Sequence, residues 1–356
     1  MELPTFGVEE EFLLVDPESG EPVAANRLVA QQAEARGLDL QLELTSCQVE
    51  TTSAVVQSSS ELRAELTRLR RIAAESASAC NTRLLAAGLP PSVPHQFPIT
   101  DTPRYRAIAD NFGMIAHEQG ICGCHVHVAV PDRGAAVHVS NWLRPWLPLL
   151  VAVSANSAIY RSTDSGYASW RSVLWARWPS AGPPPYFESV DEYDAVVEML
   201  IDTGAVLDDG MVYWDVRPSS KYPTIEVRAA DVPLTVSESV FLATLIRAAV
   251  ITALDELDGG IPAPRVPAET LRAAYWKAAR DGLSGRAIDL AGGYRSAPTR
   301  DLLAGFIERV APALDQLGEH ATIRDELNRL LEVGNGAMRQ TRAWRQRGEA
   351  SDVIRE

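Results

Sequence analysis

The chain has 356 residues, 46% of them hydrophobic and 22% charged, which is typical of a globular protein with a substantial core. Its formal net charge of -14 argues against a nucleic-acid backbone or an anionic membrane surface as the main partner. Four cysteines are too few for a disulfide framework, the N-terminus M-E-L-P-T does not have the pattern of a secretory signal, and no apolar run is long enough to span a membrane, so we expect a cytoplasmic protein.

The first predicted element is a strand over residues 6–15, F-G-V-E-E-E-F-L-L-V, which carries three consecutive acids within an apolar run. Side chains alternate across a strand, so Glu9 and Glu11 share one face while Glu10 points to the other. Two carboxylates held roughly 7 Å apart repel one another unless a positive group lies between them. A divalent metal ion is the simplest such group, so this strand predicts a metal site.

Further strands are predicted over residues 40–45, 125–130, 212–216 and 224–229. In three of them apolar residues occupy one face, whereas the other face carries acids, imidazoles or a guanidinium: Glu43, His125, His127, Glu226 and Arg228. If these strands share a sheet, their polar faces form a surface rich in carboxylates and free of lysine. Hard cations such as Mg²⁺ or Mn²⁺ select oxygen ligands of this kind.

Helices are predicted over residues 58–87, 141–160, 189–203 and 234–257, and the chain after about residue 265 is expected to be mostly helical. The first helix opens with a serine cap followed by Glu61. Strands and helices do not alternate regularly, which disfavours a parallel doubly wound sheet. We therefore predict an α+β fold in a single domain over residues 1–356, with a mainly antiparallel sheet and helices packed on its outer side.

Two alternatives compete with a carboxylate-held metal. The stretch C-G-C-H-V-H suggests a zinc site from Cys122, Cys124, His125 and His127, but the cysteines and histidines alternate to opposite faces of a strand. Any single acid can also belong to an ordinary solvated sheet face. No phosphate-binding glycine loop or serine-hydrolase motif is present, so metals and arginines would have to hold a nucleotide.

Seven motifs lie in order along the chain: F-G-V-E-E-E-F, E-L-T-S-C-Q-V-E, G-C-H-V-H-V, A-N-S-x-x-x-R-x-x-D-S-G-Y-A-S-x-R, R-W-P-S-A-G-P-P, W-D-V-R-P-S-S-K-Y-P-T-I-E-V-R-A-A-D and G-N-G-A-M-R-Q. Together they resemble the carboxylate–amine ligases of the glutamate–cysteine ligase type 2 group, also called YbdK-type. Any one motif alone would be weak, but the set in this order is specific.

The resemblance implies a glutamine-synthetase-like catalytic core, with a curved antiparallel sheet around the active site. It implies ATP and Mg²⁺ (or Mn²⁺) and a reaction in which ATP phosphorylates a substrate carboxylate. An amine then attacks the acyl phosphate and gives an amide, ADP and phosphate. Glutamate and cysteine are the default substrates of the group, and a homodimer is its expected assembly.

The resemblance also assigns residues by position. The metal ligands are Glu9, Glu11, Glu43, Glu50, His125 and Glu226. Arg228 resembles an arginine that contacts phosphate or the substrate carboxylate, and we predict it to be catalytic. The other cationic candidates come from the residues themselves: Arg171 as a second catalytic residue, and Arg161, Arg177, Arg217 and Lys221 for the nucleotide phosphates. Each arginine could instead be an ordinary surface residue or form a structural salt bridge.

One pair of these residues fits a regular strand poorly. Glu43 and Glu50 fall on opposite faces if the chain is straight, so both reach the site only if it bends near Ser46 and Cys47. Two other functions stay open at this point. One is a metal-dependent amide hydrolase, and the other is a non-catalytic relative that binds metal or nucleotide.

Overall fold

The computed structural model describes residues 3–94 and 96–356, and its centre is a seven-stranded sheet with antiparallel neighbours. The strand order is β2-β3-β1-β5-β9-β8, and β4 pairs with β1. The strands are β1 (Phe6–Val15), β2 (Gln41–Leu42), β3 (Gln48–Thr52), β4 (Arg83–Leu85), β5 (Gly123–Ala129), β8 (Val216–Pro218) and β9 (Thr224–Asp231). Two hairpins lie outside it, β6 (Ile159–Tyr160) with β7 (Thr163–Asp164) and β10 (Arg286–Asp289) with β11 (Arg295–Pro298).

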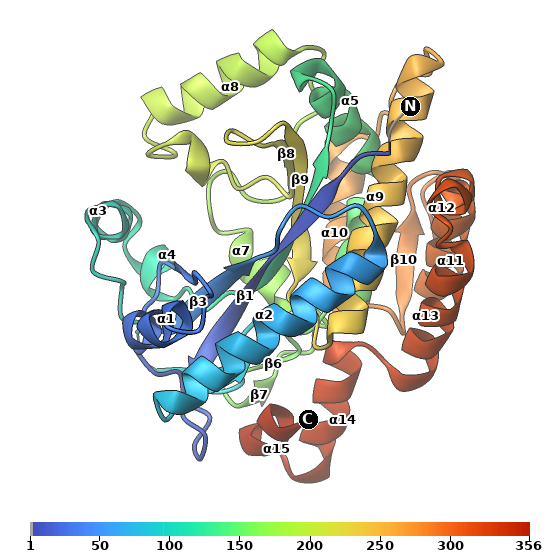
Figure 1. Cartoon of the computed structure of the whole chain (residues 1–356). Helices are drawn as coiled ribbons and strands as arrows, with labels where there is room; N and C mark the ends of the chain where they lie inside the picture. The colour runs from blue at the N-terminus through green and yellow to red at the C-terminus, as the bar shows by residue number, and fades with distance from the viewer. Residues whose placement is uncertain (1–2, 95) are drawn as a thin grey trace.

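Helices occupy most of the remaining chain. They are α1 (Asn26–Glu34), α2 (Ser59–Ala79), α3 (Pro103–Phe112), α4 (Met114–His117), α5 (Arg133–Leu143), α6 (Leu147–Ser154), α7 (Trp170–Trp175), α8 (Val190–Asp202), α9 (Val236–Asp258), α10 (Ala268–Asp281), α11 (Thr299–Arg309), α12 (Ala311–Leu317), α13 (His320–Val333), α14 (Gly336–Arg347) and α15 (Ala350–Arg355). The long helices α2 and α9 lie against one face of the sheet (Figure 1). The predicted α+β class with an antiparallel sheet is confirmed.

Alternation along β1 determines which face of the sheet the helices cover. Phe6, Val8 and Phe12 are almost completely buried on the helix side, in the main hydrophobic cluster. Glu10 shares that side and pairs with Arg70 of α2. Glu9 and Glu11 are only partly buried, on the opposite side. The predicted division of the three acids is confirmed.

The helix predicted over residues 58–87 begins as expected but ends early. Ser58 and Glu61 form a complete capping box, and the leucines that follow at helical spacing are buried. The helix stops at Ala79, because Asn81 adopts a left-handed backbone conformation and residues 83–85 then pair with β1 as β4. Pairing with the sheet overrides helical propensity there.

Three other regions differ from the predicted pattern. The helix expected over residues 141–160 is two helices, α5 and α6, with Pro148 in the first turn of α6. The strand expected over residues 212–216 reaches the sheet only at Val216, after a 3₁₀ turn at Asp209–Met211. The C-terminal part contains the β10–β11 hairpin, where Asp289 Oδ1 accepts the N–H groups of Ala291 and Gly292 in the turn.

One hydrophobic cluster joins buried residues from Phe6 to Ile354. The helices after residue 265 therefore pack on the same core as the sheet, and the single domain stays a prediction. Within the described residues, no helix has both the length and the apolar character needed to cross a bilayer.

Candidate metal and catalytic site

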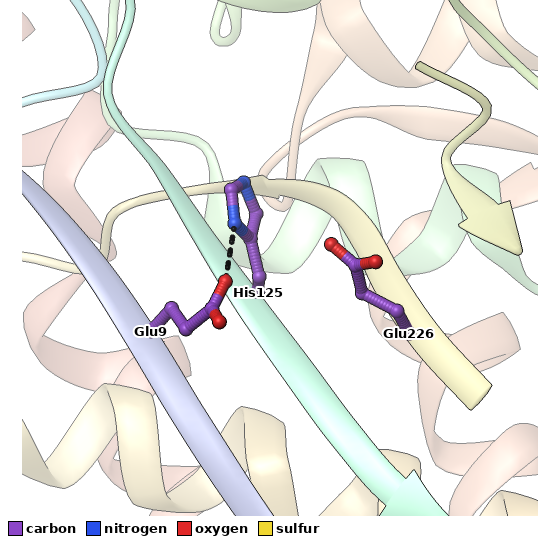
Figure 2. A group of neighbouring side chains, drawn as sticks. All are labelled: Glu9, His125 and Glu226. Carbon is purple, nitrogen blue, oxygen red and sulfur yellow. Dashed lines mark hydrogen bonds and ion pairs between the residues drawn. The ribbon is translucent and has the colours of Figure 1, made fainter. Parts of the chain in front are cut away.

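Three neighbouring strands bring Glu9, His125 and Glu226 together on the sheet face opposite α2 and α9. Glu9 on β1 pairs in register with His125 on β5, and Glu226 on β9 pairs with His127. The Nδ1 atom of His125 lies 3.3 Å from Oε2 of Glu9. Figure 2 shows the three side chains projecting into one space. One ligand atom from each lies within 4.8 Å of the other two, close enough to share a metal ion.

A second group, Glu11, Glu50 and His125, meets the same distance criterion. Glu11 on β1 pairs in register with Glu50 on β3, and Nε2 of His125 lies 3.8 Å from Oε1 of Glu11. His125 therefore presents one ring nitrogen to Glu9 and the other to Glu11. A set of carboxylate oxygens with one shared imidazole suits Mg²⁺ or Mn²⁺ better than a soft cation.

Glu43 and Glu50 both reach this region, because the chain turns between them. Ser46 and Cys47 form the turn between β2 and β3, where a bend was predicted. Glu43 lies just beyond β2 and belongs to neither group of three. Burial and the nearby charge of Glu11 raise the pKa of Glu43 to about 8.

Burial and the carboxylates of Glu43, Glu9 and Glu11 likewise raise the pKa of Glu50 well above its usual value. Glu9, Glu11, Glu43 and Glu50 thus repel one another in the absence of a cation. A bound divalent ion would relieve that repulsion.

Two arginines neutralise the carboxylate of Glu226 on β9. Arg228 and Arg217 both pair with Glu226, and Arg217 Nε lies 2.9 Å from Oε2 of that carboxylate. Burial alone would raise the pKa of Glu226, but the two guanidinium groups outweigh burial and hold it well below its usual value. Arg228 also lies 3.4 Å from Nδ1 of His125, because a β-bulge between β5 and β9 falls at this level.

Gly123 has a role in the site that the sequence reasoning missed. Its backbone N–H donates a 2.5 Å hydrogen bond to Oε2 of Glu11. A Cβ atom at this position would lie 2.5 Å from an Arg171 nitrogen and 3.1 Å from Nε2 of His125. Only glycine leaves room for both side chains. The available signal was the glycine immediately before the C-H-V-H strand.

Arg171 is buried directly behind this glycine. It is 2% exposed, and it lies 3.8 Å from the buried carboxylate of Asp231. Its Nε atom has no hydrogen-bond partner among the described residues. Arg171 therefore lies between the buried carboxylate of Asp231 and the residue whose backbone N–H holds Glu11.

The remaining predicted cationic residues lie outside this cluster. Arg161 and Arg177 both pair with Glu118, at 3.0 and 2.5 Å respectively. Lys221 is exposed in the turn between β8 and β9. The structure thus brings Arg217 to the carboxylates but leaves the other three in different surroundings.

The histidine and cysteine side chains of β5 point to opposite faces, as alternation predicts. His127 Nε2 lies 3.5 Å from Glu9 and 4.0 Å from Glu226, so this histidine borders the site. Cys122 and Cys124 are fully buried in the hydrophobic core, where burial raises the pKa of both thiols. Neither cysteine belongs to a potential metal group of the described residues, and the zinc alternative has no support.

The site is thus an antiparallel sheet with helices on one face and acids around a shared histidine on the other. The family model of glutamate–cysteine ligase family 2 (GCS2) matches residues 5–356, and the chain belongs to this family of carbon–nitrogen ligases. The resemblance inferred from the motifs is confirmed.

Relatives with high identity cover the whole chain. A protein of Mycolicibacterium smegmatis named "Putative glutamate--cysteine ligase 2-3" is 65% identical over 353 residues, which are 99% of this chain and 97% of the relative. A Nocardia farcinica protein named "Putative glutamate--cysteine ligase 2-1" is 60% identical over 356 residues, covering 100% of this chain and 93% of the relative.

Solved structures share the fold at much lower identity. The glutamate–cysteine ligase of Francisella tularensis, a complex with AMP, has a TM-score of 0.71 at 14% identity, covering 100% of this chain and 88% of that one. A bifunctional glutathione synthetase from Pasteurella multocida has a TM-score of 0.70 at 15% identity, covering 99% and 51%.

Proposed function

We propose that this protein is an ATP-dependent carboxylate–amine ligase, with glutamate and cysteine as the first substrates to test. The observation that carries the proposal is the pair of carboxylate groups that share His125, directly beside Arg228. Phosphoryl transfer needs such a combination, because negative charge on the transferring group must be neutralised and oriented. The family and the AMP complex of the Francisella tularensis ligase support a nucleotide substrate.

The donor set fits Mg²⁺ or Mn²⁺. The ligands would be Glu9, Glu11, Glu50, His125 and Glu226, with Glu43 beside them. Burial and the neighbouring carboxylates raise the pKa of Glu50, and a bound cation would favour its ionised form. When bound, divalent ions supply charge neutralisation and orientation of the phosphate oxygens.

Different cationic side chains would bind the substrate carboxylate, the transferring phosphoryl group and the other nucleotide phosphates. We assign Arg228, which lies 3.4 Å from Nδ1 of His125, to the transferring phosphoryl group or the substrate carboxylate, and we assign Arg171 to the catalytic residues beside it. We assign the nucleotide phosphates chiefly to Arg217 and Lys221 of the β8–β9 hairpin. Arg161 and Arg177 pair with Glu118 outside the carboxylate groups, so we assign these two the smaller contribution.

The reaction needs no nucleophile from the protein. A substrate carboxylate oxygen attacks the γ-phosphorus of ATP and ADP leaves, which forms an acyl phosphate. The neutral amine nitrogen then attacks the acyl carbon, phosphate leaves, and the surplus amine proton passes to a nearby carboxylate. The cysteines of β5 are buried in the core and take no part.

The direct test supplies the purified protein with ATP, Mg²⁺, glutamate and cysteine, then with pools of other acids and amines. We expect phosphate release and an amide product that require every component. Glu11→Gln should abolish turnover without unfolding the protein, whereas Glu21→Gln, at an exposed position, should leave it unchanged.

Each contrary outcome points to a specific alternative. Consumption of an amide without ATP would favour the hydrolase, and nucleotide binding without turnover would favour the non-catalytic relative. A fully active Glu11→Gln enzyme would remove the metal assignment. We also propose a homodimer located in the cytoplasm, which light scattering and cell fractionation would test.

A further inference from the structure

The closing motif G-N-G-A-M-R-Q has no place in the chemistry described so far, yet its last residue is buried. Gln340 on α14 is 5% exposed. Its Nε2 donates to the carbonyl oxygen of Asn156 at 2.8 Å and to the side-chain Oδ1 of Asn156 at 2.9 Å. Its Oε1 accepts the N–H groups of Ala158 at 2.8 Å and Ile159 at 3.3 Å. One side chain therefore holds the whole segment 156–159.

That segment is attached in turn to the C-terminal end of β9. The backbone N–H of Asn156 and the hydroxyl of Ser157 donate to Oδ2 of Asp231 at 2.8 and 2.7 Å. The hydroxyl of Ser169 donates to Oδ1 of the same carboxylate at 2.8 Å. Asp231 is 1% exposed, so these donors and Arg171 satisfy a carboxylate that water does not reach.

Arg171 connects this buried carboxylate to the site. The hydroxyl of Ser157 accepts the backbone N–H of Arg171 at 3.0 Å, and the Arg171 guanidinium donates to the carbonyl oxygen of Arg228 at 3.5 Å. The same guanidinium fills the space beside Gly123, whose N–H holds Glu11. Gly123 also pairs in register with Asp231. Hydrogen bonds and packing thus lead from α14 to two residues of the candidate site.

We propose that Gln340 is a positioning residue: through Asn156 and Asp231 it sets the position of Arg171, and through Gly123 that of Glu11. The inference rests on the proposed function for its catalytic consequence only. Loss of the Gln340 side chain would remove its four hydrogen bonds to segment 156–159. The N–H of Asn156 and the hydroxyl of Ser157 would then be held less firmly against Asp231, the counter-ion of Arg171. A small displacement of groups that orient a substrate is costly in rate.

A purely structural role for Gln340 is the competing explanation, because buried hydrogen bonds also stabilise a fold. The two explanations differ in what changes. If Gln340 only stabilises the fold, its substitution would lower the free energy of unfolding and leave the folded enzyme with normal kinetic constants. A positioning residue would lower kcat in the folded enzyme, because Arg171 and Glu11 would no longer hold the reacting groups in place.

The experiment compares Gln340→Met, Asp231→Asn and the control Gln346→Met, which changes an exposed glutamine on the same helix. Kinetics are measured well below the unfolding temperature of each variant. We expect Gln340→Met and Asp231→Asn to lower kcat about tenfold at a temperature where both variants are folded, as circular dichroism would check. The control Gln346→Met should have the same kinetic constants as the wild-type protein.

Hydrogen exchange provides a second measurement that does not need turnover. Gln340→Met should accelerate exchange in peptides that contain Gly123 and Arg228, but not in peptides from α2. Equal acceleration everywhere, or unaltered kinetic constants in folded Gln340→Met, would overturn the proposal. If the unchanged protein shows no ATP-dependent turnover, the ligase function fails, and the exchange pattern alone decides whether Gln340 positions Gly123.

Discussion

Arg70 binds both carboxylate oxygens of Glu10, with NH2 2.6 Å from Oε1 and Nε 2.9 Å from Oε2. The hydroxyl of Ser239 donates to the same carboxylate at 2.6 Å, and Glu10 is completely buried. The middle acid of the opening motif is therefore part of the sheet–helix interface. Its two neighbours, one residue away on each side, belong to the candidate site.

Removing the partner of this buried carboxylate should destabilise the fold. Arg70→Met leaves Glu10 charged and without its counter-ion, which we expect to cost about 3–5 kcal/mol in the free energy of unfolding. Urea denaturation measures the cost. Arg71→Met is the matched control, because Arg71 forms only an exposed pair with Glu75 and should change stability by less than about 1 kcal/mol. Equal stability of the two variants would contradict this account of Glu10.

Gly123→Ala should damage the site more than the fold. The new methyl group would lie 2.5 Å from an Arg171 nitrogen and 3.1 Å from Nε2 of His125, so the guanidinium must move away and the imidazole must shift slightly. We expect turnover to fall about hundredfold, since misplacement of catalytic groups by roughly 1 Å has that effect. Gly305→Ala is the control, because nothing lies within 4 Å of a Cβ atom there. Normal turnover in Gly123→Ala would show that the close packing is not required.

The acidic cluster should make metal-free stability depend on pH. The carboxyl of Glu43 has its pKa raised to about 8 from a model-peptide value of 4.5, so the folded protein binds a proton there that the unfolded chain releases. This contribution is fully present below pH 4.5 and is lost as the pH rises through about 8. Unfolding in EDTA should therefore become easier between pH 5 and pH 8.

Glu43→Gln tests the origin of that loss. Glutamine resembles the protonated carboxyl in shape and carries no charge, so the variant should lose less stability over the same pH range. Added Mg²⁺ should restore stability to the unchanged protein at the upper end of the range, because ions bind only the folded site. An identical pH dependence in the variant would mean that other groups produce it.

Two arginines offer a direct comparison of nucleotide assignments. Arg217 lies against Glu226, whereas Arg161 pairs with Glu118 away from the carboxylate groups. We expect Arg217→Gln to raise KM for ATP about tenfold and Arg161→Gln by less than about twofold, since a charged hydrogen bond to phosphate is worth roughly 1.5–3 kcal/mol. The reverse order would reassign the phosphates to the Glu118 region.

Much of the site was predictable because the strand has a period of two. Glu9, Glu11 and His125 each alternate with buried apolar neighbours, and alternation alone separated them from Glu10 and from the cysteines. Alternation also selected Glu226, the motifs added Glu50, and the structure brings both to the same place. Their role as metal ligands stays a prediction.

Other features depend on contacts between segments that are far apart in the chain. The early end of α2 results from pairing of β4 with β1. The direction of the Arg228 side chain toward His125 results from a bulge opposite His125. No local pattern encodes either, because the partner strand lies about seventy to one hundred residues away.

The amino-acid pattern by itself determined the faces of the strands, since side-chain direction is a local property of an extended backbone. Tertiary structure decided which faces meet and what each arginine contacts. Arg171, Arg177 and Arg217 look alike in the sequence, yet they pair with Asp231, Glu118 and Glu226 respectively. Those partners are chosen by sheet register and by the burial of distant segments, which only the folded chain brings together.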